Sequence, residues 1–153
     1  MRLGARLAHG SFSPEAELAD FLAEVAGEGA VASFVGLARP ATAAGEAVSR
    51  LFLDHHPRLT QRSLDEIAAA AARFAVSAVR IVHRCGAIDA GEPIVFVAAA
   101  AAHRRAAFEA ADYLMDRLKT EAVFWKREEG PDGTRWIEPT DRDYADRARW
   151  SET

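Results

Sequence analysis

Cysteine is almost absent from this chain of 153 residues, in which Cys85 is the only one. One cysteine excludes an intrachain disulfide and a metal cluster built from several thiolates, and it is typical of a reducing compartment. Long apolar runs are missing as well. No stretch approaches the ~20 residues of a membrane-spanning helix, and residues 1–17 lack the apolar core of a signal peptide. We therefore expect a soluble, cytoplasmic protein without a membrane partner.

A surplus of basic residues is also lacking. Lys plus Arg number 19 against 23 Asp plus Glu, a formal net charge of −4, so we expect no nucleic-acid partner. The P-loop, the dinucleotide fingerprint and the Gly-x-Ser-x-Gly motif are absent too. The composition, 50% hydrophobic and 27% charged, is that of a globular protein. The length predicts one domain over residues 1–153, with a polar, less ordered tail from about residue 139.

Turn residues and apolar periodicity divide the chain into helices and strands. Helices are expected to begin at Pro14, with Ser13 as the N-cap, and at Pro57, and a third covers residues 103–119. Strands are expected over residues 2–8, 29–39 with a bulge at Gly36, 47–56, 77–88, 92–102, 122–128 and 134–138. The strand over 47–56 is a candidate partner of 29–39, and the last two form a hairpin. This order predicts an α+β domain with a largely antiparallel sheet and three main helices.

Lys119 and Lys126 flank an apolar segment in LKTEAVFWKREEG, residues 118–130. A lysine beside an apolar strand is usually a surface residue, whose stem lies on hydrocarbon while its charge stays in water. The alternative is a partly buried amine that loses its proton readily and serves as a base or nucleophile. The segment by itself leaves both interpretations open.

His103 and Arg104 stand where an apolar strand gives way to a helix. A helix N-terminus binds anions through its unpaired backbone N–H groups. The added imidazole and guanidinium therefore favour a phosphate site over side chains that simply point into solvent. Arg39, at the end of a strand, is a weaker candidate for binding phosphate or carboxylate.

Zinc ligands are suggested by the run Asp54, His55 and His56, with His83 elsewhere. Adjacent histidines on a strand point to opposite faces, however, so we expect no metal site. We expect packing roles for the thiol of Cys85 and for the three tryptophans, Trp125, Trp136 and Trp150.

Four segments form a series from about Ala30 to Trp136: FVGLAR, HRCGAIDAGE, AAAHRRAAFEAADYLMDRLK and VFWKREEGPDGTRW. In order and spacing they resemble the large catalytic subunit of molybdopterin synthase, the MoaE family. The resemblance implies a fold of the alpha/beta-hammerhead type and no cofactor. It also implies a sulfurtransferase of molybdenum cofactor biosynthesis, which converts cyclic pyranopterin monophosphate into molybdopterin by installing two sulfurs as a dithiolene.

Partners and site residues follow from the same resemblance. The implied sulfur donor is the C-terminal Gly-Gly thiocarboxylate of a small ubiquitin-like subunit, in a heterotetramer built on a homodimer. Sulfur that arrives in this form needs no thiol on this chain. The implied catalytic residues are Lys119 and Lys126. The implied substrate-binding residues are Leu37, Ala38, Arg39, His103, Arg104, Lys119, Lys126, Arg127 and Glu128.

The chain departs from the family pattern at LDHHP, residues 53–57, where the family often has Tyr-Glu-x-Tyr. Asp54 is the candidate replacement for the glutamate, and the aromatic contacts are lost. The alternative function is a non-catalytic module that binds an anion or a ubiquitin-like C-terminal tail. Two lysines beside a phosphate site favour the enzyme, because tail binding alone does not require them.

The expected helix separates His103 from Lys119 by 16 residues. At ~1.5 Å per residue they lie about 24 Å apart, too far for both to touch one small pterin. Either the helix breaks or a second copy of the chain supplies one of the two residues. The apolar face of the helix favours the second alternative, and so a homodimer.

Overall fold

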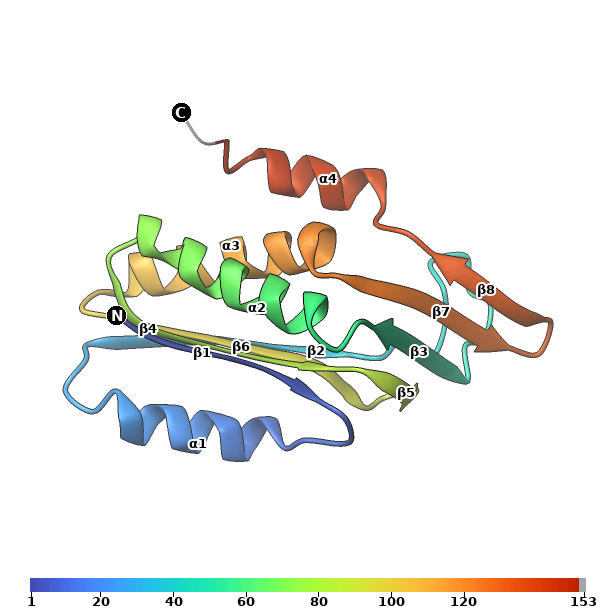
Figure 1. The fold of residues 1–153 in the computed structure, drawn as a ribbon, viewed down its shortest axis with the longest axis horizontal. Coiled ribbons are helices and arrows are strands. Elements are labelled where there is room, and N and C mark those ends of the chain that lie inside the picture. Colours follow the sequence, from blue (N-terminus) through green and yellow to red (C-terminus); the bar gives the residue numbers. More distant parts are fainter. Residues whose placement is uncertain (152–153) are drawn as a thin grey trace.

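Two four-stranded sheets organise residues 1–151, the part of the chain that the computed structural model describes. Their strand orders are β1-β4-β6-β2 and β5-β3-β7-β8. The strands are β1 (Arg2–Ala8), β2 (Ala30–Leu37), β3 (Arg50–His55), β4 (Val76–Arg84), β5 (Gly86–Asp89), β6 (Pro93–Ala101), β7 (Phe124–Gly130) and β8 (Gly133–Ile137). The helices are α1 (Pro14–Glu24), α2 (Leu59–Ala70), α3 (Arg104–Glu121) and α4 (Asp141–Ala148), with a 3-10 turn at Ala71–Arg73. Figure 1 shows α1 on one face of the first sheet and α2 with α3 on the other.

The central strand β6 is buried on both faces. The side chains from Val95 to Ala101 are at most 5% exposed, and they alternate between two cores. Val97 and Ala99 pack with α2 and α3, whereas Phe96 and Ala98 pack with α1. Because alanine ends at Cβ, the helices on both faces can approach the sheet closely.

The second sheet holds Lys126 on a packed face. Strand β3 lies between β5 and β7, and its register places Leu53 opposite Lys126. Directly opposed side chains of an antiparallel pair share a face, and Leu53 packs with Ala38 and Ile88 in a third, small core. Lys126 therefore lies on the covered face of β7, and strand alternation puts Arg127 on the other face.

The fold class and several local features predicted from the sequence are confirmed. Most strand pairs are antiparallel, although β1 and β4 pair in parallel. Ser13 caps α1, because its Oγ accepts a hydrogen bond of 3.2 Å from the backbone N–H of Ala16, and Pro14 is the first helical residue. The register of β2 shifts at Gly36, as expected of a bulge, and β7 and β8 form the expected hairpin.

Strand pairing near residue 85 differs from the prediction. Residues 77–88 are two strands, because the chain turns after β4 at Gly86, whose φ of 84° lies in the left-handed region that favours glycine. The turn sends β5 into the second sheet, where it pairs with β3. Strand β3 therefore pairs with β5 and β7, and the predicted pairing with β2 is wrong. Alternation within a strand does not determine its partner.

The C-terminal tail is ordered up to residue 151, contrary to the prediction, and residues 152–153 lie outside the described part of the chain. Thr140 and Asp143 form a capping box at the start of α4, with hydrogen bonds of 2.9 and 3.1 Å. The helix lies against α3, and after it the indole N–H of Trp150 donates to Asp116 at 2.6 Å while the ring packs edge-on against Tyr113. The partners that order this polar segment lie on α3 and at Arg73 and Phe74, so its own composition does not reveal them.

The predicted packing role holds for Trp150. Cys85 is buried, and its Sγ lies 3.4 Å from Nδ1 of His9. The packing role is wrong for Trp125 and Trp136, which are 50% and 60% exposed on the second sheet. Only the face of that sheet that carries Leu53 is packed against other residues. The alternate side chains of β7 lie on the opposite face and point outward. None of the helices within residues 1–151 has both the length and the apolar character that crossing a membrane demands.

Gly29 permits a close contact between the start of β2 and the chain that leads into α3. A Cβ added at this residue lies 2.1 Å from the carbonyl oxygen of Ala102, so backbone must move to accept it. We expect Gly29→Ala to lower the free energy of unfolding by about 1–3 kcal/mol, measured by thermal or urea denaturation. Gly10→Ala is the matched control, since a Cβ there meets nothing within 4 Å. Equal stability of the two variants would show that this contact imposes no constraint.

Candidate functional site

Lys119 and Lys126 are the only lysines among the 19 lysine and arginine residues of the chain. Lys119 lies in the last turn of α3, and β7 begins soon after that helix ends. Two buried hydroxyls of α2 hold the link between them: Thr60 Oγ1 donates to the carbonyl of Val123 at 2.6 Å, and the N–H of Val123 donates to Ser63 Oγ at 3.1 Å. The two amines therefore project from a fixed connection.

Lys126 is half-buried among charges of both signs. Burial lowers the pKa of Lys126, and the positive charges of Lys119 and Arg39 lower it further, whereas the carboxylates of Glu128 and Asp143 act in the opposite direction. The net effect favours loss of the proton. Of the two interpretations that the sequence left open, the structure supports the partly buried amine, because a lysine with its ammonium in bulk water has no desolvation penalty.

His83 lies beside the lysines and was considered in the sequence only as a metal ligand. Its ring stacks on Phe124, with centroids 4.3 Å apart and planes at 27°. Its Nδ1 is 2.9 Å from the carbonyl oxygen of Arg84, which can only accept, so Nδ1 carries the proton and Nε2 is an acceptor. Burial lowers the pKa of His83 to about 4, and Lys119 and Lys126 contribute to the shift. The ring is therefore neutral at pH 7. Its neighbours come from distant strands, so local sequence gave no signal for it.

Arg39 is held at the end of β2 by the backbone of Ala38. The N–H of Ala38 donates to the carbonyl of Glu92 at 2.9 Å, and its own carbonyl accepts from Gly91 at 2.7 Å. Ala38 itself is buried, and Leu37 is 54% exposed. The loop that follows β5 therefore fixes the backbone beside Arg39, whose positive charge acts on Lys126.

Arg127 and Glu128 have different surroundings on β7. The guanidinium of Arg127 lies over the rings of Phe52 and Trp136, at 4.4 and 5.6 Å from their centroids, on the face away from Lys126. Glu128 shares the face of Lys126 and pairs with Arg135 at 2.9 Å. The substrate-binding role expected of Arg127 stays a prediction.

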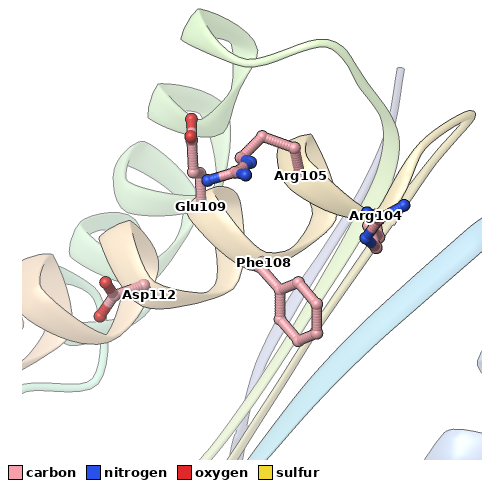
Figure 2. A pocket seen from close by; sticks show the side chains of 5 residues that line it. All are labelled: Arg104, Arg105, Phe108, Glu109 and Asp112. Carbon is pink, nitrogen blue, oxygen red and sulfur yellow. The ribbon is translucent and has the colours of Figure 1, made fainter.

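The start of α3 forms a second, separate group. His103 is the N-cap residue and makes no capping side-chain hydrogen bond, and the first turn contains no acidic residue. Both His103 and Arg104 are exposed. An open hollow of about 340 Å³ lies along this helix. Figure 2 shows the side chains that line it, which are Arg104, Arg105, Phe108, Glu109 and Asp112. Arg105 is directed toward Glu109, while Arg104 lies at the helix start. The arrangement suits an anion, as expected from the sequence.

One chain does not bring the two groups together. Helix α3 runs without a break from Arg104 to Glu121, so His103 and Lys119 remain about 24 Å apart at ~1.5 Å per residue. The first of the two alternatives drawn from the sequence, a broken helix, is wrong. The structure unites Arg39, Lys119, Lys126 and Glu128, and it leaves His103 and Arg104 at the far end of the helix.

Asp54, the candidate replacement for a family glutamate, is exposed near the end of β3. Its carboxylate accepts a hydrogen bond of 2.9 Å from the backbone N–H of His55, and its register partner on β7 is Trp125. Lys126 pairs with the preceding residue of β3, so Asp54 lies on the opposite face from that amine. This placement offers no support for a role of Asp54 at the lysines.

A family model described as "MoaE protein" matches residues 7–121. The chain belongs to the MoaE family. A relative from Caulobacter vibrioides, named molybdopterin synthase catalytic subunit, is 53% identical over 142 residues, which cover 92% of this chain and 93% of that protein. The family predicted from the sequence is thereby confirmed.

Solved structures agree with this membership. The chain described as molybdopterin biosynthesis MoaE protein from Burkholderia ambifaria MC40-6 has a TM-score of 0.81 and 39% identity, with 100% of both chains covered. A chain from a protein-protein complex of subunits 1 and 2 of molybdopterin-converting factor, from Helicobacter pylori 26695, has a TM-score of 0.72. It is 18% identical, with 90% of this MoaE-family chain and 91% of that chain covered, and it shares the fold.

Replacing Lys126 should reveal the cost of holding a charge at this position. Because the folded-state pKa of Lys126 lies below its ordinary value of 10.5, the charged amine lowers stability at every pH below the folded pKa. The penalty fades as the pH rises through that pKa. We therefore expect Lys126→Met to melt at a higher temperature than the wild type near pH 7, with a difference that shrinks toward pH 10.

The control is Arg62→Met, since Arg62 is an exposed cation of α2. Its effect on the free energy of unfolding should stay within about 0.5 kcal/mol. A stability difference for Lys126→Met that does not change with pH would show that the substitution acts through packing and not through charge.

Proposed function

We propose that this chain is the catalytic subunit of a molybdopterin synthase. It converts cyclic pyranopterin monophosphate into molybdopterin, with sulfur from the C-terminal thiocarboxylate of a small ubiquitin-like subunit. The observation that carries the proposal is the proximity of Lys119 and Arg39 to the half-buried Lys126 in a MoaE-family chain. The cytoplasm is the compartment in which this chain works.

The two lysines divide the chemistry according to their surroundings. Lys119 is exposed in the last turn of α3, where its ammonium attracts the anionic thiocarboxylate and the charge that develops on it. Lys126 has the lowered pKa, so it takes up and releases a proton as each carbon–sulfur bond to the substrate forms and water cleaves the acyl–sulfur bond, which leaves a carboxylate on the small subunit. Glu128 and Asp143 keep enough negative charge nearby for Lys126 to regain its proton.

His83 positions the amines and does not compete for their protons. Its neutral ring packs on Phe124, two residues before Lys126, and Nδ1 is bonded to the backbone. A positive ring there would repel both lysines, and burial prevents this at neutral pH. The ring therefore supports β7 beneath Lys126 without adding a charge.

The phosphate of the substrate is bound by a second copy of the chain. His103 and Arg104 supply the cations and α3 supplies open N–H groups, but they lie too far from the lysines of their own chain. Within the described residues, strand β2 is an edge strand of the first sheet with no partner on its outer side. Exposed apolar side chains lie along β2 and near the start of α3. They are Phe34, Val35, Leu37 and Phe108. Two copies joined there form a homodimer, with a small subunit at each end.

The decisive test of the function is product formation with defined partners. The chain is mixed with a thiocarboxylated small subunit and cyclic pyranopterin monophosphate, and the dithiolene product is measured. We expect Lys126→Ala to lower the rate by about 10²-fold or more, as does loss of a proton-transferring group. Lys126→Arg should fail similarly, because arginine keeps the charge but does not release its proton.

Arg62→Ala is the control, because Arg62 is exposed on α2. A wild-type chain that binds the small subunit but forms no product would instead support a non-catalytic tail-binding module. Full activity of Lys126→Arg would mean that this residue supplies only charge.

A mixed-dimer experiment tests the shared site. His103→Ala and Lys119→Ala chains should each be inactive alone, because every site contains one defect. After random subunit exchange about half of the dimers are mixed, and each mixed dimer has one intact site of two, so about a quarter of the wild-type activity returns. Exchange is verified with mass-tagged chains. Verified exchange without recovery would mean that each chain builds its own pocket.

A further inference from the structure

Three side chains that the proposed reaction does not use converge between the two sheets. His9 follows β1, His55 is the last residue of β3, and Cys85 separates β4 from β5. One ligand atom from each lies within 4.8 Å of the other two. Cys85 Sγ and His9 Nδ1 are 3.4 Å apart, and the two imidazole rings meet edge to face at 5.3 Å.

The spacing matches that of ligands around one tetrahedral ion. With Zn–S and Zn–N bonds of about 2.3 and 2.0 Å, a sulfur and a nitrogen on the same zinc lie about 3.5 Å apart. The Sγ–Nδ1 separation of 3.4 Å already has this value. The His55 nitrogen needs only a small approach, which rotation of a side chain on the half-buried end of β3 provides.

The backbone around the cluster is fixed before any ion binds. The N–H of Cys85 donates to the carbonyl of Ala8 at 3.0 Å, which ties the thiol to the residue before His9. The N–H of His55 is bonded to the carboxylate of Asp54 at 2.9 Å. Cys85 is 2% exposed whereas His9 is exposed, so an ion would have protein on one side and a water ligand on the other.

The donor set selects the kind of ion. One thiolate and two imidazoles suit borderline-soft Zn²⁺, while Mg²⁺ and Ca²⁺ require oxygen ligands. We propose that His9, His55 and Cys85 form a zinc site with three protein ligands and one open position. Binding releases the thiol proton of Cys85 to solvent as the Zn–S bond forms.

The site would join the two sheets. His9 and Cys85 belong to the end of the β1–β4 pair in the first sheet, and His55 belongs to β3 in the second. Strand β3 carries Leu53, whose register partner is Lys126. Zinc therefore holds the sheet that presents the catalytic amine, without touching the substrate. It also gives a role to residues 53–57, where the chain departs from the family pattern.

Metal titration of the purified chain after chelator treatment tests the proposal. Co²⁺ serves as the spectroscopic probe, because a thiolate ligand adds a near-ultraviolet charge-transfer band to its spectrum. We expect one Co²⁺ per chain with this band, displacement by one Zn²⁺, and a rise in melting temperature with Zn²⁺. Cys85→Ser should remove the band, and His9→Gln should weaken Zn²⁺ binding at least tenfold.

His56→Asn is the matched control, because the ring of His56 is occupied by the backbone N–H groups of Arg58 and Leu59 at the start of α2. It should bind Zn²⁺ as the wild type does. Since His9 is exposed, His9→Gln folds even if Cys85→Ser does not. The proposal is overturned if the wild type binds less than one Zn²⁺ per chain at micromolar concentration, or if His9→Gln binds as tightly as His56→Asn.

Discussion

Burial of β6 on both faces is the constraint from which the rest of the architecture follows. A strand covered on two sides admits only apolar side chains, and alanine lets α1 pack on one face and α2 with α3 on the other. The chain leaves β6 directly into α3, a helix of 18 residues that crosses the sheet. The start and the end of α3 are thereby forced apart. The anion group at His103 and the amine group at Lys119 occupy these two ends.

The use of lysine instead of arginine at the amine site follows from the ability of lysine to release its proton. Within residues 1–151 arginine forms ion pairs with carboxylates at several places, as at Arg84 with Glu92 and Arg80 with Glu24. Lysine is confined to the two positions beside the proposed reaction. Arginine cannot give up its proton in a protein, whereas a half-buried lysine can. Burial, and not sequence spacing alone, distinguishes Lys126 from a surface cation.

The junction between the sheets depends on contacts among segments far apart in the chain. The turn at Gly86 directs β5 away from the first sheet, and this turn brings Cys85 next to His9 and near His55. The same junction places His83 against Phe124. The contacts of Cys85 with His55 and of His83 with Phe124 each join a residue of the first sheet to one of the second. The geometry beneath Lys126 is therefore set by long-range packing and not by β7 itself.

Rules that depend only on local sequence were sufficient to predict several features of the helices and strands. Capping at Ser13, the bulge at Gly36 and the hairpin of β7 and β8 were all predicted, because each depends on neighbours in sequence. The four motifs also sufficed for the family. Tertiary structure alone decided that β3 pairs with β7, that α4 packs on α3, and that Lys126 rather than Arg127 faces the covered side. These outcomes depend on which distant surfaces meet, and the free energy of such contacts is not encoded in any single stretch of residues.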